Sequence, residues 1–235
     1  MKTIGFIGGM SWESSIEYYR ISNQVVREKL GGLHSAKSLM VSLDFAEVEE
    51  LQAAGDWEAA TRMMVSAARQ LEAGGADFVV ICTNTMHLMA QDVEDAIGIP
   101  LLHIADAAAV EIKESGLDTV GLLGTQFTME KDFYRVRLAQ KHGLQVLIPD
   151  RAQREEVHRI IYDELVVGEI RDDSREIYLD VIRQLEERGA QGIILGCTEI
   201  GLLVKQEDLA LPVFDTAEIQ ARIAVEVALG ERKLD

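Results

Sequence analysis

Residues 70–84 read QLEAGGADFVVICTN, and residues 184–198 read QLEERGAQGIILGCT. The two stretches align without a gap, and each joins the end of a helical pattern to a short apolar run typical of a buried strand. Two shorter matches occur in the same order, namely TIGFIG (3–8) with TVGLLG (119–124) and IPLL (99–102) with LPVF (211–214). A repeat this long is a whole domain rather than one turn of a solenoid. The chain is therefore predicted to consist of two related halves.

Short apolar runs alternate with longer amphipathic patterns on both sides of these stretches. The expected strands are residues 3–7, 38–43, 78–82, 101–104, 119–123, 144–148, 192–195 and 212–214. The expected helices are residues 13–30, 57–73, 86–96, 107–114, 129–142, 154–166, 173–188 and 217–229. This alternation predicts an α/β fold of two pseudo-symmetric domains, with mostly parallel sheets and helices on both faces. We expect a first domain of residues 1–98 plus 212–235 and a second of residues 99–211.

The composition excludes several classes of protein. The chain has 235 residues, 40 of them Asp or Glu and 23 Lys or Arg, which gives a net charge of −17. Such an acidic surface repels phosphate backbones, so no nucleic-acid partner is expected. The apolar runs have the length of strands and the start of the chain lacks a signal-peptide pattern, so we expect a cytoplasmic protein without membrane contact. Two cysteines without metal-type spacing predict no metal site.

Several strand ends carry unusual residues. In parallel sheets, ligands bind beyond the carboxyl ends of the strands. Ser11 follows two glycines after the first strand and can cap the next helix, but the G-x-G-x-x-G dinucleotide pattern is missing. Cys197 ends a strand just before an expected helix, where the helix dipole favours a reactive thiolate. In the repeat, Cys197 aligns with Thr83 and Gly196 with Cys82, so Cys82 is predicted to lie in the core.

The motifs GGMS (8–11), NTMH (84–87) and GCTE (196–199) resemble those of the cofactor-independent aspartate/glutamate racemases. The likeness covers essentially the whole chain, which looks like the enterobacterial subgroup of broad-specificity amino-acid racemases. It implies two α/β domains with the active site in the cleft between them, a small amino-acid substrate and no cofactor such as pyridoxal phosphate. It also implies a homodimer.

The resemblance further implies roles for particular residues. One cysteine from each domain normally acts, and here Cys197 matches the base for the L-enantiomer while Thr83 replaces the second cysteine. The positions that match substrate-binding residues are Met10, Ser11, Gln52, Asn84, Thr85, Thr198 and Glu199. Gln52 stands where relatives often carry an arginine for the distal carboxylate, and Val167 stands where many carry a lysine. Both changes remove a positive charge and favour looser side-chain specificity.

Two other functions compete with racemisation. Decarboxylases of the same superfamily protonate a planar intermediate from one side with a single cysteine, and a single matching cysteine is what this chain retains. A non-catalytic binder of small carboxylates is the third alternative, in which Thr83 marks the loss of the chemistry. Exchange of the α-hydrogen indicates the racemase, release of carbon dioxide from a disubstituted malonate indicates the decarboxylase, and ligand-induced thermal stabilisation without exchange indicates the binder.

Overall fold

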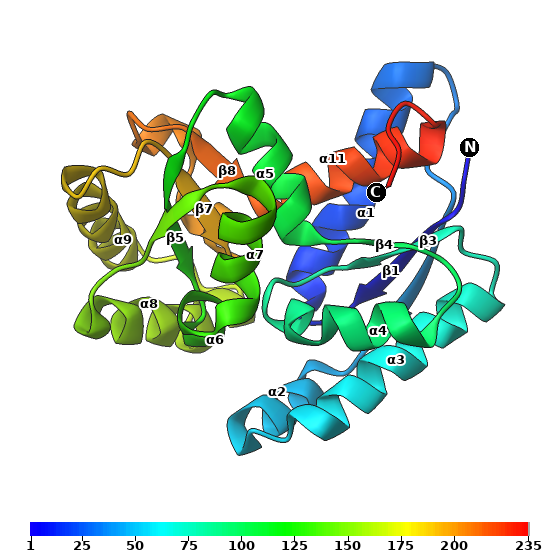
Figure 1. Cartoon of the computed structure of the whole chain (residues 1–235), viewed down its shortest axis with the longest axis horizontal. Helices are drawn as coiled ribbons and strands as arrows, with labels where there is room; N and C mark the ends of the chain where they lie inside the picture. Colours follow the sequence, from blue (N-terminus) through cyan, green and yellow to red (C-terminus); the bar gives the residue numbers. More distant parts are fainter. Residues whose placement is uncertain (235) are drawn as a thin grey trace. The chain divides into compact units, whose positions relative to one another are not determined.

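Each half of the chain forms one four-stranded parallel sheet, as the repeat predicts. The structure is a computed structural model that describes residues 1–234 (Figure 1). The first sheet has the order β2-β1-β3-β4, with strands β1 (Ile4–Gly8), β2 (Ser38–Ser42), β3 (Phe78–Ile81) and β4 (Leu101–Leu102). The second has the order β6-β5-β7-β8, with strands β5 (Thr119–Gly124), β6 (Gln145–Leu147), β7 (Ile193–Gly196) and β8 (Val213–Asp215). The expected α/β fold is confirmed.

The strand register shows that the repeat is structural as well as sequential. Ile7 pairs with Ile81 between β1 and β3, and their repeat equivalents Leu123 and Leu195 pair between β5 and β7. Because both pairs of strands share this register, Thr83 and Cys197 follow equivalent strand ends in their own sheets.

Both halves of the chain also contain helices. Those of the first half are α1 (Trp12–Leu30), α2 (Phe45–Ala54), α3 (Trp57–Ala73) and α4 (Ala90–Ala96), with the 3₁₀ helix η1 (Thr85–Met89). Those of the second half are α5 (Ile104–Glu114), α6 (Gln126–Glu130), α7 (Asp132–His142), α8 (Arg151–Asp163), α9 (Asp172–Glu187) and α10 (Ile200–Leu203), with η2 (Leu165–Val167) and η3 (Gln206–Asp208). The last helix is α11 (Thr216–Leu229). Within residues 1–234, none of these helices combines the length and apolar character needed to cross a membrane.

The first sheet is covered on both faces (Figure 1). Val79 and Ile81 of β3 belong to a buried cluster with side chains of α3 and α4, among them Met64. On the other face, the ring of Tyr18 in α1 packs edge-on against Phe6 of β1. The Tyr18 hydroxyl donates a hydrogen bond of 2.6 Å to the Gln220 side chain in α11, so its polar end is satisfied inside the core.

Several helical segments differ from the prediction. Helix α2 was not expected, although Asp44 caps its start and Gly55 ends it in a left-handed conformation. Its sequence, FAEVEELQAA, has only a weak apolar periodicity, so its caps were the available signal. The helix expected over residues 86–96 begins as the 3₁₀ turn η1, and the one expected over 129–142 is interrupted at Lys131, whose backbone is extended.

The compact units also differ from the expected domains. Unit 1 contains Met1–Ile104 with the C-terminal segment from Gln220, and unit 2 contains Ala105–Ile219. The expected boundaries, after residue 98 and before residue 212, separate β4 and β8 from their sheets. The structure keeps both strands in place because β4 pairs with β3 and β8 pairs with β7.

Candidate active site

The turn after β1 is built by serine hydroxyls. Ser11 is buried, and its hydroxyl accepts a hydrogen bond of 3.5 Å from the amide of Ser14, which caps α1 as predicted. Ser15 Oγ donates to the Ser11 carbonyl at 2.7 Å and accepts from the amide of Gly9 at 2.8 Å. Gly9 has a φ of +87°, and a Cβ there would lie 2.1 Å from the carbonyl oxygen of Leu43. The turn therefore requires glycine at this position and leaves Met10 buried beside the core of unit 1.

A short segment that contains polar residues follows β3. Cys82 is fully buried, and burial raises the pKa of its thiol well above the ordinary value. Thr83 is half-buried, whereas Asn84 and Thr85 are buried at the start of η1. Since β1 and β3 are adjacent parallel strands, the residues after them share one edge of the sheet.

Gln52 reaches the same region from the unexpected helix α2. It is buried, and its Nε2 donates to the sulfur of Met86 at 3.2 Å. Met86 lies in η1, two residues after Asn84, so the structure brings Gln52 close to the segment that follows β3. Gln52 therefore presents an uncharged amide here, without the positive charge that an arginine would carry.

His87 is the residue of unit 1 that sequence reasoning missed. Its Nδ1 lies 2.7 Å from the carbonyl oxygen of Thr83, and its Nε2 accepts a hydrogen bond of 3.1 Å from the amide of Ile104. The ring lies 4.5 Å, between centroids, from that of His103. No role for His87 was predicted from the sequence, but a signal was available, because His87 belongs to the NTMH motif.

In unit 2, the residues after β7 form a hydrogen-bonded group around one carboxylate. Oε2 of Glu199 accepts a hydrogen bond of 3.1 Å from the thiol of Cys197 and one of 2.8 Å from the hydroxyl of Thr198. All three residues are buried, and Glu199 is only 2% exposed. The structure thus gathers the three predicted residues of this strand end, with Glu199 as their common acceptor.

The prediction that Cys197 is a thiolate is wrong. The sequence predicts a thiolate, but burial and the negative charge of Glu199 raise the pKa of the thiol well above its ordinary value. The helix that follows, α10, has only 4 residues, so its dipole is too small to offset these effects. Cys197 rests as a thiol that donates its proton towards Glu199.

Asp215 at the end of β8 also borders this group. It pairs with Leu195 of β7 in the sheet, and its Oδ1 accepts hydrogen bonds from the amides of Ala217 (3.0 Å) and Glu218 (3.2 Å) at the start of α11. A Cβ on Gly201 in α10 would lie 2.2 Å from Asp215 Oδ2, so α10 packs directly on this carboxyl group. A side chain at position 201 would require the Asp215 carboxyl group to move.

Asp215 should make the stability of the protein depend on pH. Burial, with Glu218 adding to it, raises its pKa from 3.8 to about 6. The folded protein therefore binds this proton more tightly than the unfolded chain. The stabilisation is complete below the ordinary pKa of 3.8 and is lost as the pH rises through about 6. Between pH 4 and pH 8, the free energy of unfolding of the wild-type protein should fall by about 2.5 kcal/mol through this group, and Asp215→Asn should abolish that fall. Chemical denaturation of both proteins across this range checks it, and parallel pH profiles would contradict it.

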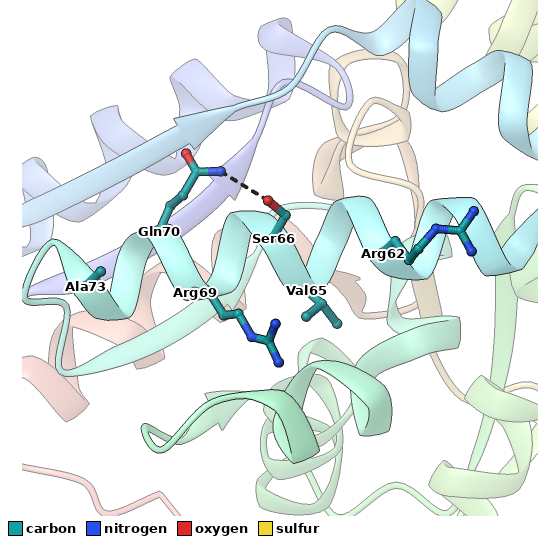
Figure 2. A pocket seen from close by; sticks show the side chains of 6 residues that line it. All are labelled: Arg62, Val65, Ser66, Arg69, Gln70 and Ala73. Atoms are coloured by element: carbon teal, nitrogen blue, oxygen red, sulfur yellow. Dashed lines mark hydrogen bonds between the residues drawn. The ribbon is translucent and has the colours of Figure 1, made fainter.

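A separate depression on α3 contains none of these residues (Figure 2). Its arginines are already engaged, Arg62 with Glu58 and Arg69 with the carbonyl oxygen of Ala96. Gln70 Nε2 donates to the Ser66 hydroxyl at 3.4 Å within the same face. We therefore assign no site there. Within residues 1–234, no group of three or more His, Cys, Asp and Glu side chains is arranged to hold a metal ion.

Comparisons with known proteins show the family and agree with the fold. The family model described as Asp/Glu/Hydantoin racemase matches residues 7–224. The crystal structure of a candidate Asp/Glu racemase from Yersinia pestis is 57% identical, with a TM-score of 0.91 over 97% of this chain and 100% of that one. The aspartate racemase homologue of Pyrococcus horikoshii OT3 is 37% identical, with a TM-score of 0.84 over the same shares of the two chains. The broad specificity amino-acid racemase RacX of Bacillus subtilis is 22% identical over 74% of this chain and 75% of its own length.

Proposed function

The chain belongs to the Asp/Glu/hydantoin racemase family, and from this premise we propose that it is an amino-acid racemase that moves a proton at the α-carbon without pyridoxal phosphate. Aspartate and glutamate are the first candidate substrates. Neutral amino acids follow, because Gln52 is uncharged and a relative bears the name of a broad-specificity enzyme.

One observation carries this proposal. Two sheets with the same strand order and register end in polar segments at equivalent positions, one with Thr83 and the other with Cys197. Racemisation needs one group to remove a proton from the α-carbon and another to return a proton on the opposite face. A duplicated fold with one proton-carrying residue in each copy supplies such a pair.

In this proposal, Cys197 is the base for the L-enantiomer, and Glu199 prepares it. The thiol proton moves along the 3.1 Å hydrogen bond to the carboxylate, which leaves a thiolate beside a neutral acid. The pair keeps a single negative charge throughout, so no second charge is created in a buried site. The thiolate then takes the α-proton as the C–H bond breaks, and the electron pair of that bond is delocalised into the substrate carboxylate.

Thr83 serves the opposite face. Its hydroxyl, or a water that it orients, gives a proton to the planar intermediate, which yields the D-enantiomer. The alkoxide or hydroxide left behind regains a proton from solvent, and Glu199 releases the proton that it accepted from Cys197. A hydroxyl is a much weaker acid than a thiol, so this step is the slow one. Asn84, Thr85 and Thr198 are assigned to the carboxylate and amino groups, Met10 and Ser11 to the wall of the site, and Gln52 to the substrate side chain.

Proton NMR in deuterium oxide tests the proposal directly. L- and D-aspartate, L- and D-glutamate and several neutral amino acids are incubated with the protein, and loss of the α-proton signal is followed with time. We expect exchange at the α-carbon and slow appearance of the opposite enantiomer. Absence of exchange from every substrate in the panel would refute the proposal.

The decarboxylase alternative predicts a different result. The same protein would then release carbon dioxide from a disubstituted malonate and leave the α-hydrogen of amino acids in place. A non-catalytic binder would show ligand-induced thermal stabilisation with neither reaction. Thr83, which stands where a second thiol is expected, is the feature that favours testing both.

Activity should not depend on an added cofactor. The proposed steps use only protein groups, so exhaustive dialysis against a chelator, followed by a carbonyl reagent that removes pyridoxal phosphate, should leave the exchange rate within about twofold of the untreated protein. Restoration of lost activity by a metal or by pyridoxal phosphate would show that the proposed chemistry is incomplete.

We also propose a homodimer that works in the cytoplasm, as the family resemblance implies. Sedimentation equilibrium with the full-length chain tests the dimer, and fractionation of the source cells tests the location.

A further inference from the structure

We propose that His87 is a positioning residue that fixes Thr83 for its proton transfer by tying the Thr83 carbonyl to the start of α5. This inference rests on the proposed function, because it assigns His87 to the Thr83 side of the reaction. It adds a residue outside the set predicted from the sequence.

The hydrogen bonds of His87 define its protonation state. An amide N–H can only donate, so Nε2, which receives the N–H of Ile104 at 3.1 Å, must be an unprotonated acceptor. A carbonyl oxygen can only accept, so Nδ1, at 2.7 Å from the oxygen of Thr83, must carry the proton. His87 is therefore neutral, with its proton on Nδ1, and both ring nitrogens are used.

Its surroundings hold the ring in this orientation. His87 is only 2% exposed, and it packs against His103 with 4.5 Å between ring centroids and 58° between ring planes. A buried ring that is packed on one face and hydrogen-bonded at both nitrogens has little freedom to turn. The hydrogen bond from Nδ1 in turn holds the carbonyl oxygen of Thr83.

The two partners of His87 lie on different segments of the chain. Thr83 follows β3, while Ile104 begins α5 and is the last residue of unit 1 before the chain enters unit 2. His87 thus joins the candidate catalytic segment to the place where the chain leaves the unit. The two hydrogen bonds of His87 also satisfy the amide of Ile104 and the carbonyl of Thr83, and an amide or carbonyl that is buried without a partner is costly.

The link matters for Thr83 because proton transfer depends steeply on geometry. A displacement of about 1 Å at a reacting group can cost a hundredfold in rate. The effect should be confined to the face served by Thr83, because Cys197 and Glu199 are held by contacts within unit 2. A general loss of stability, by contrast, lowers exchange from both faces.

Two variants of His87 and a control test this difference. His87→Leu removes both hydrogen bonds, whereas the amide of His87→Gln offers one donor and one acceptor. Tyr18→Phe loses a different buried hydrogen bond of unit 1 and serves as the control for stability. Each protein is assayed for deuterium wash-in from L-aspartate and for its conversion to the D-enantiomer.

We expect His87→Leu to lower conversion relative to wash-in by about tenfold or more, with partial recovery in His87→Gln and an unchanged ratio in Tyr18→Phe. Equal loss of both rates in His87→Leu, or the same ratio change in Tyr18→Phe, would overturn the proposal.

NMR of protein labelled with ¹⁵N-histidine provides a second test that does not depend on activity. Long-range proton–nitrogen correlations of the wild-type protein should show His87 as the neutral form protonated on Nδ1. The other tautomer, or a charged ring near neutral pH, would overturn the inference even if racemisation is observed. If the tautomer is correct and no substrate exchanges, the proposed function fails while the arrangement of His87 stands.

Discussion

Replacing Cys197 with serine should lower α-hydrogen exchange from L-aspartate by about 10²–10⁴-fold, the range expected when a general base is removed. Serine keeps the size and the hydrogen bond to Glu199 but does not form an anion in the range where a thiol does. Exchange from the L-enantiomer therefore measures the thiol itself. The measurement is the initial rate of deuterium wash-in, with the melting temperature recorded to confirm that the variant is folded.

Cys82 is the matched control for this experiment. Cys82 directly follows β3 and Cys197 directly follows β7. Both are buried, and both thiols have a raised pKa. They differ in two ways. The thiol of Cys197 donates a hydrogen bond to Glu199, and in the repeat Cys197 aligns with Thr83 whereas Cys82 aligns with Gly196. Cys82→Ala should keep exchange within a few-fold of the wild-type rate. Comparable losses in the two variants would mean that the assignment of the base is wrong.

The sequence repeat predicted the fold because it carries register as well as composition. Matching the stretch at 70–84 with that at 184–198 places Ile81 opposite Leu195 in the alignment, and the structure pairs each with its equivalent neighbour, Ile7 and Leu123. Apolar strands buried on both faces leave little freedom in this pairing. Helix α2 was not predicted, because its apolar periodicity is weak and its caps were not recognised.

The site could be predicted only as a set of residues at strand ends. Side-chain contacts across segments are not encoded locally, so the sequence did not show that Glu199 accepts a hydrogen bond from the thiol of Cys197 or that Asp215 packs on Gly201. His87 illustrates the same limit. Its partners Thr83 and Ile104 are brought together by the fold, and no spacing rule connects them.

The charge state of Cys197 was mispredicted for a related reason. A cysteine before a helix predicts a thiolate only if the helix is long enough and no carboxylate is near. Here a short helix and a buried glutamate reverse the expectation. The consequence is chemical, because a resting thiol must first lose its proton before it can remove one from the substrate.

That requirement is met on one face only, so the two enantiomers should exchange at different rates. Cys197 has Glu199 as a proton acceptor, whereas Thr83 offers a hydroxyl that is a poor base. We expect wash-in from L-aspartate to exceed that from D-aspartate by about tenfold or more. The final mixture must still contain equal amounts of both enantiomers, since they have the same free energy. The difference between the two enantiomers therefore appears only in the exchange rates measured before equilibrium.

Thr83→Cys should raise exchange from D-aspartate by about tenfold to a hundredfold, because it supplies a thiol at the position equivalent to Cys197. Thr83→Val, which has the same shape without the hydroxyl, should lower it instead. In both variants wash-in from L-aspartate should change less, since Cys197 and Glu199 are untouched. Equal wild-type rates from the two enantiomers, or a D-side rate that ignores both substitutions, would show that another group acts as the second base. Cys82, one residue before Thr83, would then be the first candidate to test, although its thiol is fully buried in this structure.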